Sequence, residues 1–343
     1  MGKTKVAIAL SGGLDSAVSA ALLLEKGYEV IGVTMRLADH SSQAAAPKAR
    51  VIAKHLGIPL HVLDFSFIFE KEVVAPFCEQ YVSGATPNPC VLCNRKIKFG
   101  VLLDEIRKMG VDFLASGHYA RITKDSSCFT LCKAFDPIKD QTYFLYTLKA
   151  DILPRLLFPI GNMFKKDVVE LAKKLRLPVS TNEESHDICF MSGVNYRNFI
   201  RSRIVKSPGK VYDFTGRHIG FHRGISDYTI GQRQGLNFGQ QEKYYVTAIN
   251  KTDNTITIGP KSQLEKSRLI ATGINWISGF PPRSCQNLTA KIRYGAPEIP
   301  VMLSKAEDNL EVIFATPVYA VTPGQSVVFY SGDELLGGGI IHS

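Results

Sequence analysis

An unbroken apolar run that leads into a glycine-rich loop is the feature that most constrains the fold. Residues Val6 to Leu10 are all apolar, which is typical of a parallel β-strand covered on both faces. The sequence Ser11-Gly12-Gly13-Leu14-Asp15-Ser16 follows directly, and helix-forming residues continue from Ala17 to Leu24. The two glycines allow consecutive backbone N–H groups to converge on an anion. The start of the chain therefore predicts a strand, a phosphate-binding loop and a helix.

Two side chains of this loop indicate a nucleotide and a cation. Ser16 begins the helix, so its hydroxyl and the positive helix end would face a bound phosphate. Asp15 would repel that phosphate unless a cation lay between them, which predicts Mg²⁺. No Gly-Lys-Ser/Thr follows, and the adjacent glycines do not match the dinucleotide-binding fingerprint, so the alternative is a tight turn. The hexapeptide nevertheless resembles the loop of the ATP pyrophosphatase (PP-loop) superfamily, which implies cleavage of ATP between its α and β phosphates.

Length and composition limit the class of protein. A chain of 343 residues exceeds the size of one typical core, so two or three domains are expected. No apolar run approaches the roughly 18 residues of a membrane span, which predicts a soluble protein. The first strand begins close to Met1, and the seven cysteines form an odd number, so we expect no signal peptide, a reducing compartment and a cytoplasmic location. The net charge of +10 favours a polyanionic partner.

The pattern along the chain divides it into three regions. Up to about Ile200, helical patterns alternate with predicted strands at Glu29–Met35, His61–Phe65 and Val111–Ser116. This alternation predicts an α/β fold with a doubly wound parallel sheet, whose ligands bind beyond the carboxyl ends of the strands. After Ser207-Pro208-Gly209, short β-like segments and turns replace the helices. We expect a catalytic domain over residues 1–205, a small mainly β linking domain over 206–268 and a C-terminal β-barrel over 269–343.

A Cys-x-x-Cys pair, Cys90 and Cys93, follows two prolines that stiffen the backbone. The pair has three usual interpretations, namely half of a zinc site, a redox dithiol, or a nucleophile with a helper, and the spacing alone does not decide among them. Arg95, Lys96 and Lys98 come next and would lower the pKa of the Cys93 thiol, unless they form a solvated basic face. Cys189, in an acidic turn before Phe190, has by itself the pattern of a buried structural cysteine.

Seven ordered blocks of sequence carry a specific resemblance. They are Ser11 to Ser16, Thr86 to Asn94, Ser116 to Tyr119, Lys139 to Leu145, Asp187 to Phe190, Gly231 to Leu236, and Thr322 to Gly339. Together they are similar to the tRNA-specific 2-thiouridylase (MnmA) family across nearly the whole chain. The collinear order of seven blocks is far more specific than any single motif. The resemblance implies an adenine nucleotide alpha hydrolase-like catalytic domain.

The resemblance also implies a reaction, a sulfurtransferase step at C2 of the wobble uridine (position 34) of lysine, glutamate and glutamine tRNAs. Adenylation makes the C2 oxygen replaceable, because it then departs as AMP. By similarity, Cys189 carries sulfur as a persulfide received from a sulfur-relay protein or a cysteine desulfurase. Cys93 would then act as nucleophile and form a disulfide with Cys189, which an external reductant must reset.

The resemblance assigns further roles residue by residue. The residues expected to surround ATP are Ala9, Leu10, Ser11, Gly12, Gly13, Leu14, Asp15, Ser16, Met35 and Gly117. Asn88, Pro89 and Cys90 are expected to face the target base. The residues expected to contact tRNA are His118, Lys139, Asp140, Gln141, Arg293, Tyr294 and Gln325. Without the matching blocks, His118 would be interpreted as a satisfied loop histidine and Tyr294 as a core aromatic residue.

The chain departs from the family pattern at two places. Many relatives have an aspartate where this chain has Cys90, so the general base is unassigned here. The change gives three thiols, Cys90, Cys93 and Cys189, which are the ligands for a [4Fe-4S] cluster with one open iron, and we keep this as a hypothesis. The second departure follows Met35, where the usual longer acidic loop is shortened to residues 36–42.

Two rival functions remain at this point. One is a different ligase of the same loop class, such as an amide- or argininosuccinate-forming enzyme, in which Cys93 and Cys189 would be incidental. The other is a zinc-dependent RNA-binding module that uses Cys90 and Cys93. Only one Cys-x-x-Cys is present and no His-x-x-x-His follows, so the number of zinc ligands is poor.

Overall fold

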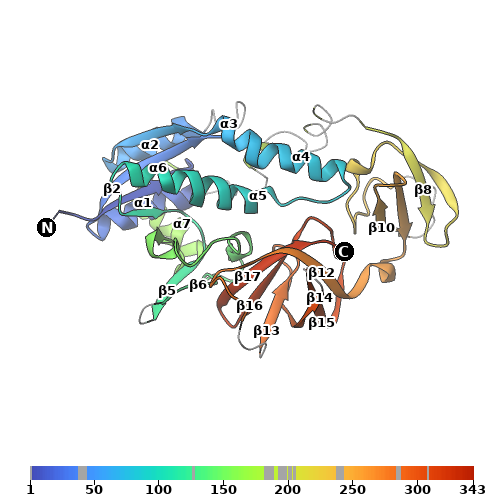
Figure 1. Cartoon of the computed structure of the whole chain (residues 1–343). Helices are drawn as coiled ribbons and strands as arrows, with labels where there is room; N and C mark the ends of the chain where they lie inside the picture. The colour runs from blue at the N-terminus through green and yellow to red at the C-terminus, as the bar shows by residue number, and fades with distance from the viewer. Residues whose placement is uncertain are drawn as a thin grey trace.

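The chain folds into a parallel α/β domain, a small four-stranded sheet and a barrel, and Figure 1 shows the α/β domain on the left, the barrel below the centre and the small sheet on the right. The computed structural model describes residues 2–37, 45–125, 128–180, 189–191, 199, 203, 206–236, 243–282, 287–306 and 309–343. Most of the shortened loop predicted after Met35 lies outside these described residues.

The first domain is built on a five-stranded parallel sheet, as the sequence predicts. The strands are β1 (Lys5–Ala9), β2 (Glu29–Arg36), β3 (Leu60–Asp64), β4 (Phe113–Ala115) and β7 (Leu156–Leu157). Their order across the sheet is β3-β2-β1-β4-β7, and every pair is parallel. The sequence β1, β2, β3 therefore runs outward from the centre before the chain returns to add β4, which is the topological switch of a doubly wound sheet.

Helices cover both faces of this sheet. One face packs against α1 (Leu14–Glu25), α2 (Ala45–Leu56) and α7 (Lys165–Lys174). On β1, Val6 and Ile8 face these helices, whereas Ala7 faces the core on the other side. This alternation follows from the two-residue period of a strand, and burial on both faces explains why the run is apolar throughout.

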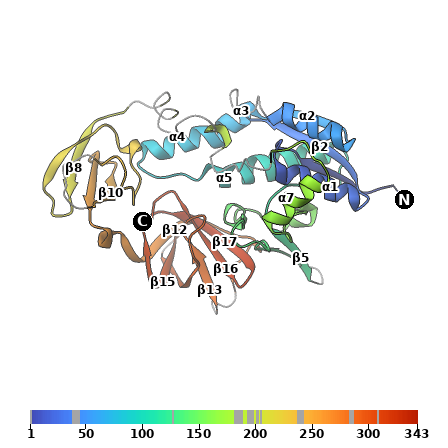
Figure 2. The ribbon, with the colours of Figure 1, turned by 180° about the vertical axis from the view of Figure 1, so that it is seen from behind.

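The opposite face is covered by a long helical arm that contains two π-helical stretches. The first half is α3 (Ser66–Phe69), η1 (Glu70–Val74) and α4 (Ala75–Val82), and the second is α5 (Pro89–Leu92), η2 (Cys93–Val101) and α6 (Leu102–Lys108). Figures 1 and 2 both show α3 and α4 extending from the parallel sheet toward the small sheet. π-Helical turns are rare and occur frequently at functional sites.

The small sheet consists of β8 (Gly209–Asp213), β9 (His218–His222), β10 (Tyr245–Asn250) and β11 (Thr255–Gly259), in the order β10-β11-β8-β9. Its own buried cluster includes Val211, Val246 and Ile256. The 3-10 helices among the described residues are η3 (Thr142–Phe144), η4 (Leu153–Arg155), η5 (Cys189–Met191), η6 (Ile225–Asp227) and η7 (Lys261–Leu264). None of the described helices is long and apolar enough to cross a membrane.

Six strands close the C-terminal barrel. They are β12 (Glu265–Trp276), β13 (Leu288–Lys291), β14 (Ile299–Ala306), β15 (Asn309–Tyr319), β16 (Ser326–Ser331) and β17 (Glu334–Ile341). The ring closes because β12 pairs with both β15 and β17. Strand β12 begins before the expected boundary at residues 268 and 269 and runs through it.

A hairpin from the first region joins the barrel, which the sequence pattern did not indicate. Strands β5 (Arg121–Asp125) and β6 (Cys128–Cys132) pair with each other, and Cys132 pairs with Glu334 of β17. The next residue continues this pairing, because the backbone N–H of Lys133 donates to the backbone carbonyl of Asp333 at 2.8 Å. The catalytic domain and the barrel therefore share one extended sheet.

Candidate active site

The glycine-rich loop forms a compact turn at the carboxyl end of β1. Gly12 has φ +82°, a left-handed conformation that favours glycine, and Gly13 is the N-cap of α1. The Ser16 hydroxyl donates to the Gly13 carbonyl at 3.0 Å and accepts from the Ser11 N–H at 3.3 Å. Ser11 and Gly13 are exposed, and the Gly13 N–H donates to the Ser11 hydroxyl at 3.3 Å, so the loop lies open to solvent beside the N-terminus of α1 with its serine hydroxyls holding the turn.

Asp15 in this loop has two protein partners that the sequence pattern did not reveal. Its Oδ1 accepts from the Tyr119 hydroxyl at 2.9 Å and from the Lys165 ammonium at 2.7 Å. Lys165 is the first residue of α7, which packs beside α1. A lysine at the start of a helix on the same sheet face is the signal that could have located it. Lys165 therefore supplies a positive charge where sequence reasoning required Mg²⁺, and Asp15 as a Mg²⁺ ligand stays a prediction.

The other residues expected around ATP line the same edge of the sheet. Ala9 and Leu10 end the first strand, and Met35 lies near the end of the neighbouring β2. Gly117 follows β4, and a Cβ there would lie 2.8 Å from the Asp15 carbonyl carbon and the Ser16 nitrogen. Only a residue without a side chain fits this close approach. The residues expected around ATP thus lie at one end of the sheet, and their contact with ATP stays a prediction.

The Cys-x-x-Cys pair lies on the short helix α5 and the start of η2. Pro89 is in the first turn of α5, where its missing N–H costs nothing, and Asn88 is the N-cap. Cys90 is half-buried, whereas Cys93 is only 5% exposed. Barrel residues hold the segment just before, because the Gln325 amide donates to the Thr86 carbonyl at 3.0 Å.

Cys189 comes to this pair from about a hundred residues further along the chain. Its neighbour Phe190 is buried against Phe69 and Phe77, with ring centroids 5.5 and 5.4 Å apart, which anchors the segment to the helical arm. Cys189 itself is solvent-exposed rather than buried. Cys90, Cys93 and Cys189 are all free thiols, and they lie near enough to one another that a thiolate at Cys189 would raise the pKa of both Cys90 and Cys93. The three thiols therefore form one cluster.

Burial dominates the chemistry of these thiols. It raises the pKa of Cys90 to about 11 and the pKa of Cys93 to about 12. The pKa of Cys189 is also raised, because protein atoms around the sulfur displace part of its water although the residue is exposed. Lys98 opposes the rise in all three, since its positive charge favours the thiolates.

Of the three cations that follow Cys93, Lys98 is therefore the one that acts on the cluster. Arg95 and Lys96 are exposed, and Lys96 pairs with Glu72 at 3.2 Å on the surface. The π-helical winding of η2 explains the difference, because a wider turn brings residues five apart, such as Cys93 and Lys98, close to the same face. The expected lowering of the Cys93 pKa is wrong in its net sign, because desolvation outweighs the charge of Lys98.

The thiol cluster does not have the arrangement of a metal site. Among the described residues, which include Cys90, Cys93 and Cys189, no group of three or more His, Cys, Asp or Glu side chains could hold a metal ion. The iron–sulfur hypothesis and the zinc-module alternative therefore find no support in the geometry.

His118 lies beside the cluster and is buried. The Ser116 hydroxyl and the His118 Nδ1 are 2.7 Å apart, and Phe99 and Phe158 flank the ring at 5.6 and 5.9 Å. Burial, and then the charge of Lys98, holds the pKa of His118 well below its usual range, so the ring is neutral at pH 7. Contact of this side chain with tRNA stays a prediction.

The remaining residues expected at tRNA lie at the junction with the barrel. Asp140 is buried, and the Gln141 side-chain oxygen accepts from the Tyr119 N–H at 3.0 Å. The Arg293 guanidinium donates to the Ala320 carbonyl and to the Thr322 hydroxyl, both at 2.7 Å. Tyr294 is 46% exposed.

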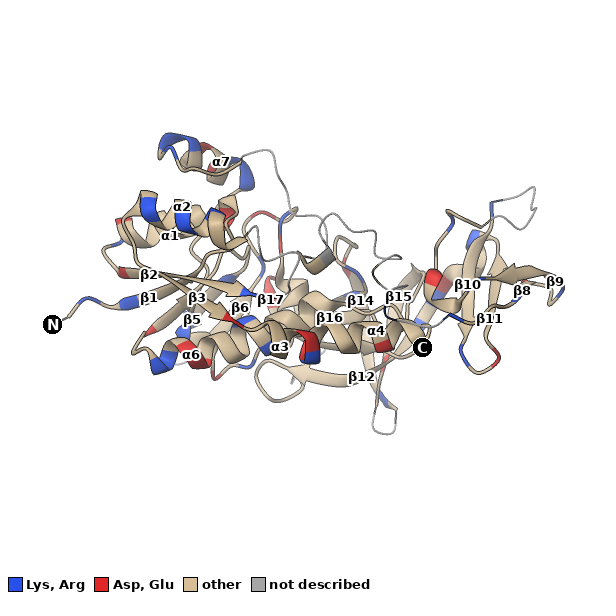
Figure 3. Ribbon diagram, turned by 90° about the horizontal axis from the view of Figure 1, so that it is seen from above, with Lys and Arg blue, Asp and Glu red and all other residues tan. Residues whose placement is uncertain are grey.

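Charge is unevenly distributed over the surface of the first domain. Figure 3 shows Lys and Arg gathered on α7 and α2, which lie together on one face of the sheet. On α7 these residues are Lys165, Lys166, Lys173 and Lys174. Such a basic face is suited to a polyanion.

Comparison with known families matches all three parts of the chain. The description tRNA methyl transferase HUP domain matches residues 4–193, the PRC-barrel domain of the same family matches 197–260, and an aminomethyltransferase β-barrel domain matches 266–341. The first of these covers more than half of the chain.

Curated relatives match over nearly the full length. A tRNA-specific 2-thiouridylase MnmA from Dehalococcoides mccartyi is 43% identical over 98% of this chain and 96% of its own. The protein of the same name from Carboxydothermus hydrogenoformans is 44% identical over 99% of this chain and 98% of its own. A solved 4-thiouridine synthetase in complex with RNA and ATP has a TM-score of only 0.36 and 15% identity, over 50% of this chain and 40% of its own. The full-length matches show that this chain belongs to the tRNA-specific 2-thiouridylase (MnmA) family.

Proposed function

We propose that this protein is an ATP-dependent sulfurtransferase that replaces the C2 oxygen of the wobble uridine, position 34, in lysine, glutamate and glutamine tRNAs. The observation that carries the proposal is the cluster of Cys90, Cys93 and Cys189 around Lys98, in the same domain as the nucleotide loop. The family name attached to residues 4–193 mentions methyl transfer, but a methyl transferase needs no such set of thiols. The full-length relatives are named for thiolation.

The nucleotide loop would carry out the first step. The loop and the N-terminus of α1 would bind the phosphates of ATP, and Lys165 would neutralise their charge beside Asp15. The uridine O2 attacks the α-phosphorus, the bond to the β-phosphate breaks, and pyrophosphate leaves. Mg²⁺ bound with ATP would add further positive charge at this point.

The thiol cluster would carry out the second step. The terminal sulfur of a Cys189 persulfide attacks C2, and the Cys93 thiolate then attacks the Cys189 sulfur. The S–S bond of the persulfide breaks, AMP leaves with the former C2 oxygen, and a Cys93–Cys189 disulfide remains. Two electrons from an external reductant restore the thiols, and a sulfur-relay protein or cysteine desulfurase reloads Cys189.

Binding of the tRNA would involve the basic face of the first domain and the barrel. The target base would lie near Asn88, Pro89 and Cys90, next to the thiols. Lys98 would favour the Cys93 thiolate, because its positive charge lowers the pKa of that thiol. A reducing cytoplasm would suit both the free thiols and the RNA substrate.

The test is an incubation with unmodified tRNA, MgATP and a sulfur donor, followed by mass analysis of the nucleosides. Wild-type protein is expected to form 2-thiouridine and AMP in equal amounts. Cys189→Ala should lose thiouridine by at least about 1000-fold, because the sulfur carrier is absent. Cys128→Ala removes an exposed thiol outside the cluster and serves as the matched control.

The outcomes separate this proposal from its main rival. If Cys189→Ala and Cys93→Ala both keep full activity toward the natural substrate, the thiols are incidental and another ligase of the same loop class is the better assignment. AMP formation that needs no RNA would also contradict thiolation as the primary reaction.

A further inference from the structure

Residues 134–142, here called the connecting segment, lie between the barrel and the nucleotide loop. The segment contains Asp140 and Gln141, for which the family resemblance implies contact with tRNA. In the structure both side chains have protein partners instead, Asp140 on the barrel side and Gln141 on the side of the loop. The segment therefore contacts the barrel on one side and residues next to the nucleotide loop on the other.

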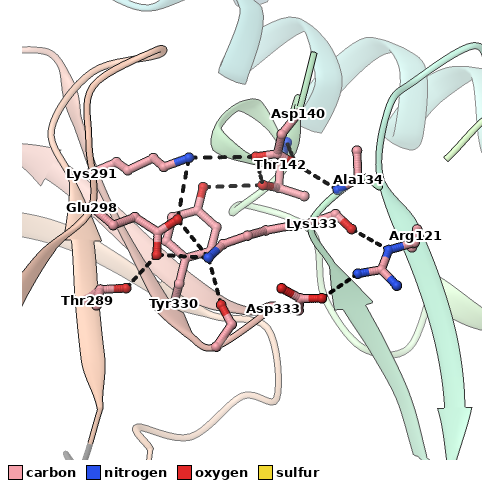
Figure 4. A network of polar contacts seen from close by, with 11 residues as sticks. Arg121, Lys133, Ala134, Asp140, Thr142, Thr289, Lys291, Glu298, Tyr330 and Asp333 are labelled. Carbon is pink, nitrogen blue, oxygen red and sulfur yellow. Dashed lines mark hydrogen bonds and ion pairs between the residues drawn. The ribbon is translucent and has the colours of Figure 1, made fainter. Parts of the chain in front are cut away.

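A chain of charged groups ties the segment to the barrel, as Figure 4 shows. The Asp140 carboxylate lies 3.9 Å from the Lys291 ammonium, and Lys291 lies 3.5 Å from Glu298. Glu298 also pairs with Lys133 at 2.7 Å. Both ammonium groups lie over the ring of Tyr330, at 4.7 Å for Lys133 and 5.3 Å for Lys291. These groups are mostly buried, so their interactions are stronger than surface pairs.

Asp140 also holds the two ends of the segment together. One oxygen accepts from the Ala134 N–H at 3.0 Å, and the other accepts from the Thr142 hydroxyl at 2.7 Å. The Thr142 oxygen lies 3.3 Å from the Tyr330 hydroxyl of the barrel. The Asp140 side chain is only 4% exposed, so its conformation is fixed by these partners rather than by solvent.

Two routes lead from the segment to Asp15 of the nucleotide loop. In the first, Gln141 forms two hydrogen bonds with the Tyr119 backbone, at 2.9 and 3.0 Å, and the Tyr119 hydroxyl donates to Asp15 at 2.9 Å. In the second, Asp136 accepts from the Lys165 backbone N–H at 2.9 Å, and the Lys165 ammonium donates to Asp15 at 2.7 Å. Every link of both routes is within hydrogen-bonding distance.

We propose that the connecting segment couples the barrel to ATP chemistry, with Lys291 and Asp140 as positioning residues for Tyr119 and Lys165. This inference rests on the proposed function, because it takes the barrel to be part of the tRNA site. A shift of the barrel relative to the catalytic domain moves Asp140, and the two routes transmit that shift to the groups around Asp15. ATP is then used efficiently only when the barrel is correctly placed on its substrate.

The test measures AMP formation in single-turnover reactions with saturating ATP and unmodified tRNA. Lys291→Met removes the ammonium that Asp140 faces, and it should lower the rate at saturation about tenfold. The dissociation constants for ATP and for tRNA should each change by less than about threefold, because Lys291 lies outside the nucleotide loop and its mostly buried ammonium faces Asp140 and Glu298. Lys291→Arg retains the charge and should restore the rate.

Controls separate coupling from a general loss of structure. Lys305→Met removes an exposed lysine from β14 of the same barrel and should leave the rate unchanged. If Lys291→Met does not fold, Thr142→Val tests the same link, because it removes only the hydroxyl between Asp140 and Tyr330. Its rate should fall by a similar factor.

A double-variant comparison decides whether the links act as one route. Tyr119→Phe removes the hydroxyl that donates to Asp15. If the links act as one route, the rate of the double variant Tyr119→Phe/Lys291→Met should lie within about threefold of the rate of the slower single variant. Multiplicative losses would overturn the proposal, and so would a Lys291→Met enzyme that binds tRNA weakly but reacts at the normal rate at saturation. If the wild-type protein forms no thiouridine, the proposed function itself fails. If the wild-type protein forms thiouridine and Lys291→Met forms AMP at the same rate, only the coupling proposal fails.

Discussion

The nucleotide loop and the thiol cluster lie in one domain but are built in opposite ways. The loop is open, with Ser11 and Gly13 exposed. Its Ser11 and Ser16 hydroxyls form hydrogen bonds within the loop, and Asp15 adds bonds to Tyr119 and Lys165. The thiol cluster joins segments about a hundred residues apart and buries Cys93, whose pKa is raised to about 12. In the proposed reaction, the open loop would receive ATP first, and the raised pKa values would keep the buried thiols protonated at pH 7 until the adenylated base is in place.

Cys93→Ser should have the largest effect, because it should stop the thiol step and leave the nucleotide step intact. With Cys189 loaded as a persulfide, this variant should release 2-thiouridine at least about 1000-fold more slowly, because no thiolate attacks the Cys189 sulfur. Consumption of ATP in the first turnover should continue at the normal rate, since the nucleotide loop is intact. Quenched-flow measurement of AMP, pyrophosphate and nucleosides checks both parts. An equal loss of pyrophosphate release would mean that the two regions do not act separately.

Lys165→Met should affect the nucleotide half alone. Removal of the ammonium 2.7 Å from Asp15 leaves that carboxylate to repel the phosphates, and we expect about a 100-fold loss of kcat/KM for ATP. Lys165→Arg keeps the charge and is the matched control. Binding of tRNA to the Met variant, measured by filter retention, should stay within about threefold of wild type. A normal ATP response in this variant would remove Lys165 from the site.

Lys98→Met should affect the thiol half and its pH dependence. Below a pKa of about 12 the thiolate fraction of Cys93 rises tenfold per pH unit, so the single-turnover rate of thiouridine release should rise steadily from pH 7 to 10. Loss of Lys98 removes a charge that lowers this pKa, and the rate at any pH in this range should fall by about 10-fold or more. Lys98→Arg should retain most of the rate. A wild-type plateau below pH 9 would show that Cys93 ionises more easily in the substrate complex.

Gly117→Ala should produce a smaller change in the nucleotide half. The added Cβ would lie 2.8 Å from the backbone of Asp15 and Ser16, so the loop must shift to make room. We expect ATP to bind about tenfold more weakly, as measured by calorimetry, with thiol reactivity unchanged. Gly2→Ala is the matched control, because no atom lies within 4 Å of the Cβ position at Gly2. Gly110→Ala is unsuitable, because Gly110 has φ +70°, which strains any other residue. Unchanged ATP affinity would show that the loop tolerates the shift.

The smallest expected effect is on the salt dependence of tRNA binding. If the lysines of α7 contact phosphates, log K for tRNA should fall linearly with log salt, with a slope of about −0.7 to −0.9 per contact. Lys173→Gln combined with Lys174→Gln should reduce that slope by up to about 2 units, while the rate of AMP formation at saturating tRNA stays the same. A slope identical to wild type would place the RNA on another face.

Much of the first domain could be predicted because its signals are local. The apolar run at Val6–Leu10 requires a doubly covered strand, and β1 occupies Lys5–Ala9 in the centre of the parallel sheet. The glycine loop, the helix after it and the carboxyl-end position of Gly117 follow from the same rules. Cys189 was different, because its own neighbourhood indicated a structural cysteine, and only the family resemblance placed it with Cys93.

Sequence alone determined the alternation of strands and helices, the glycine-rich loop and the three candidate thiols, since each depends on residues near one another or on motif blocks in a fixed order. The tertiary structure decided which partners those groups have: Lys165 and Tyr119 on Asp15, Lys98 among the thiols, and Asp140 in a buried network with Lys291. It also reversed the expected pKa of Cys93, because burial depends on the packing of distant segments. Charge pairing and desolvation are properties of three-dimensional neighbours, and a linear pattern does not contain them.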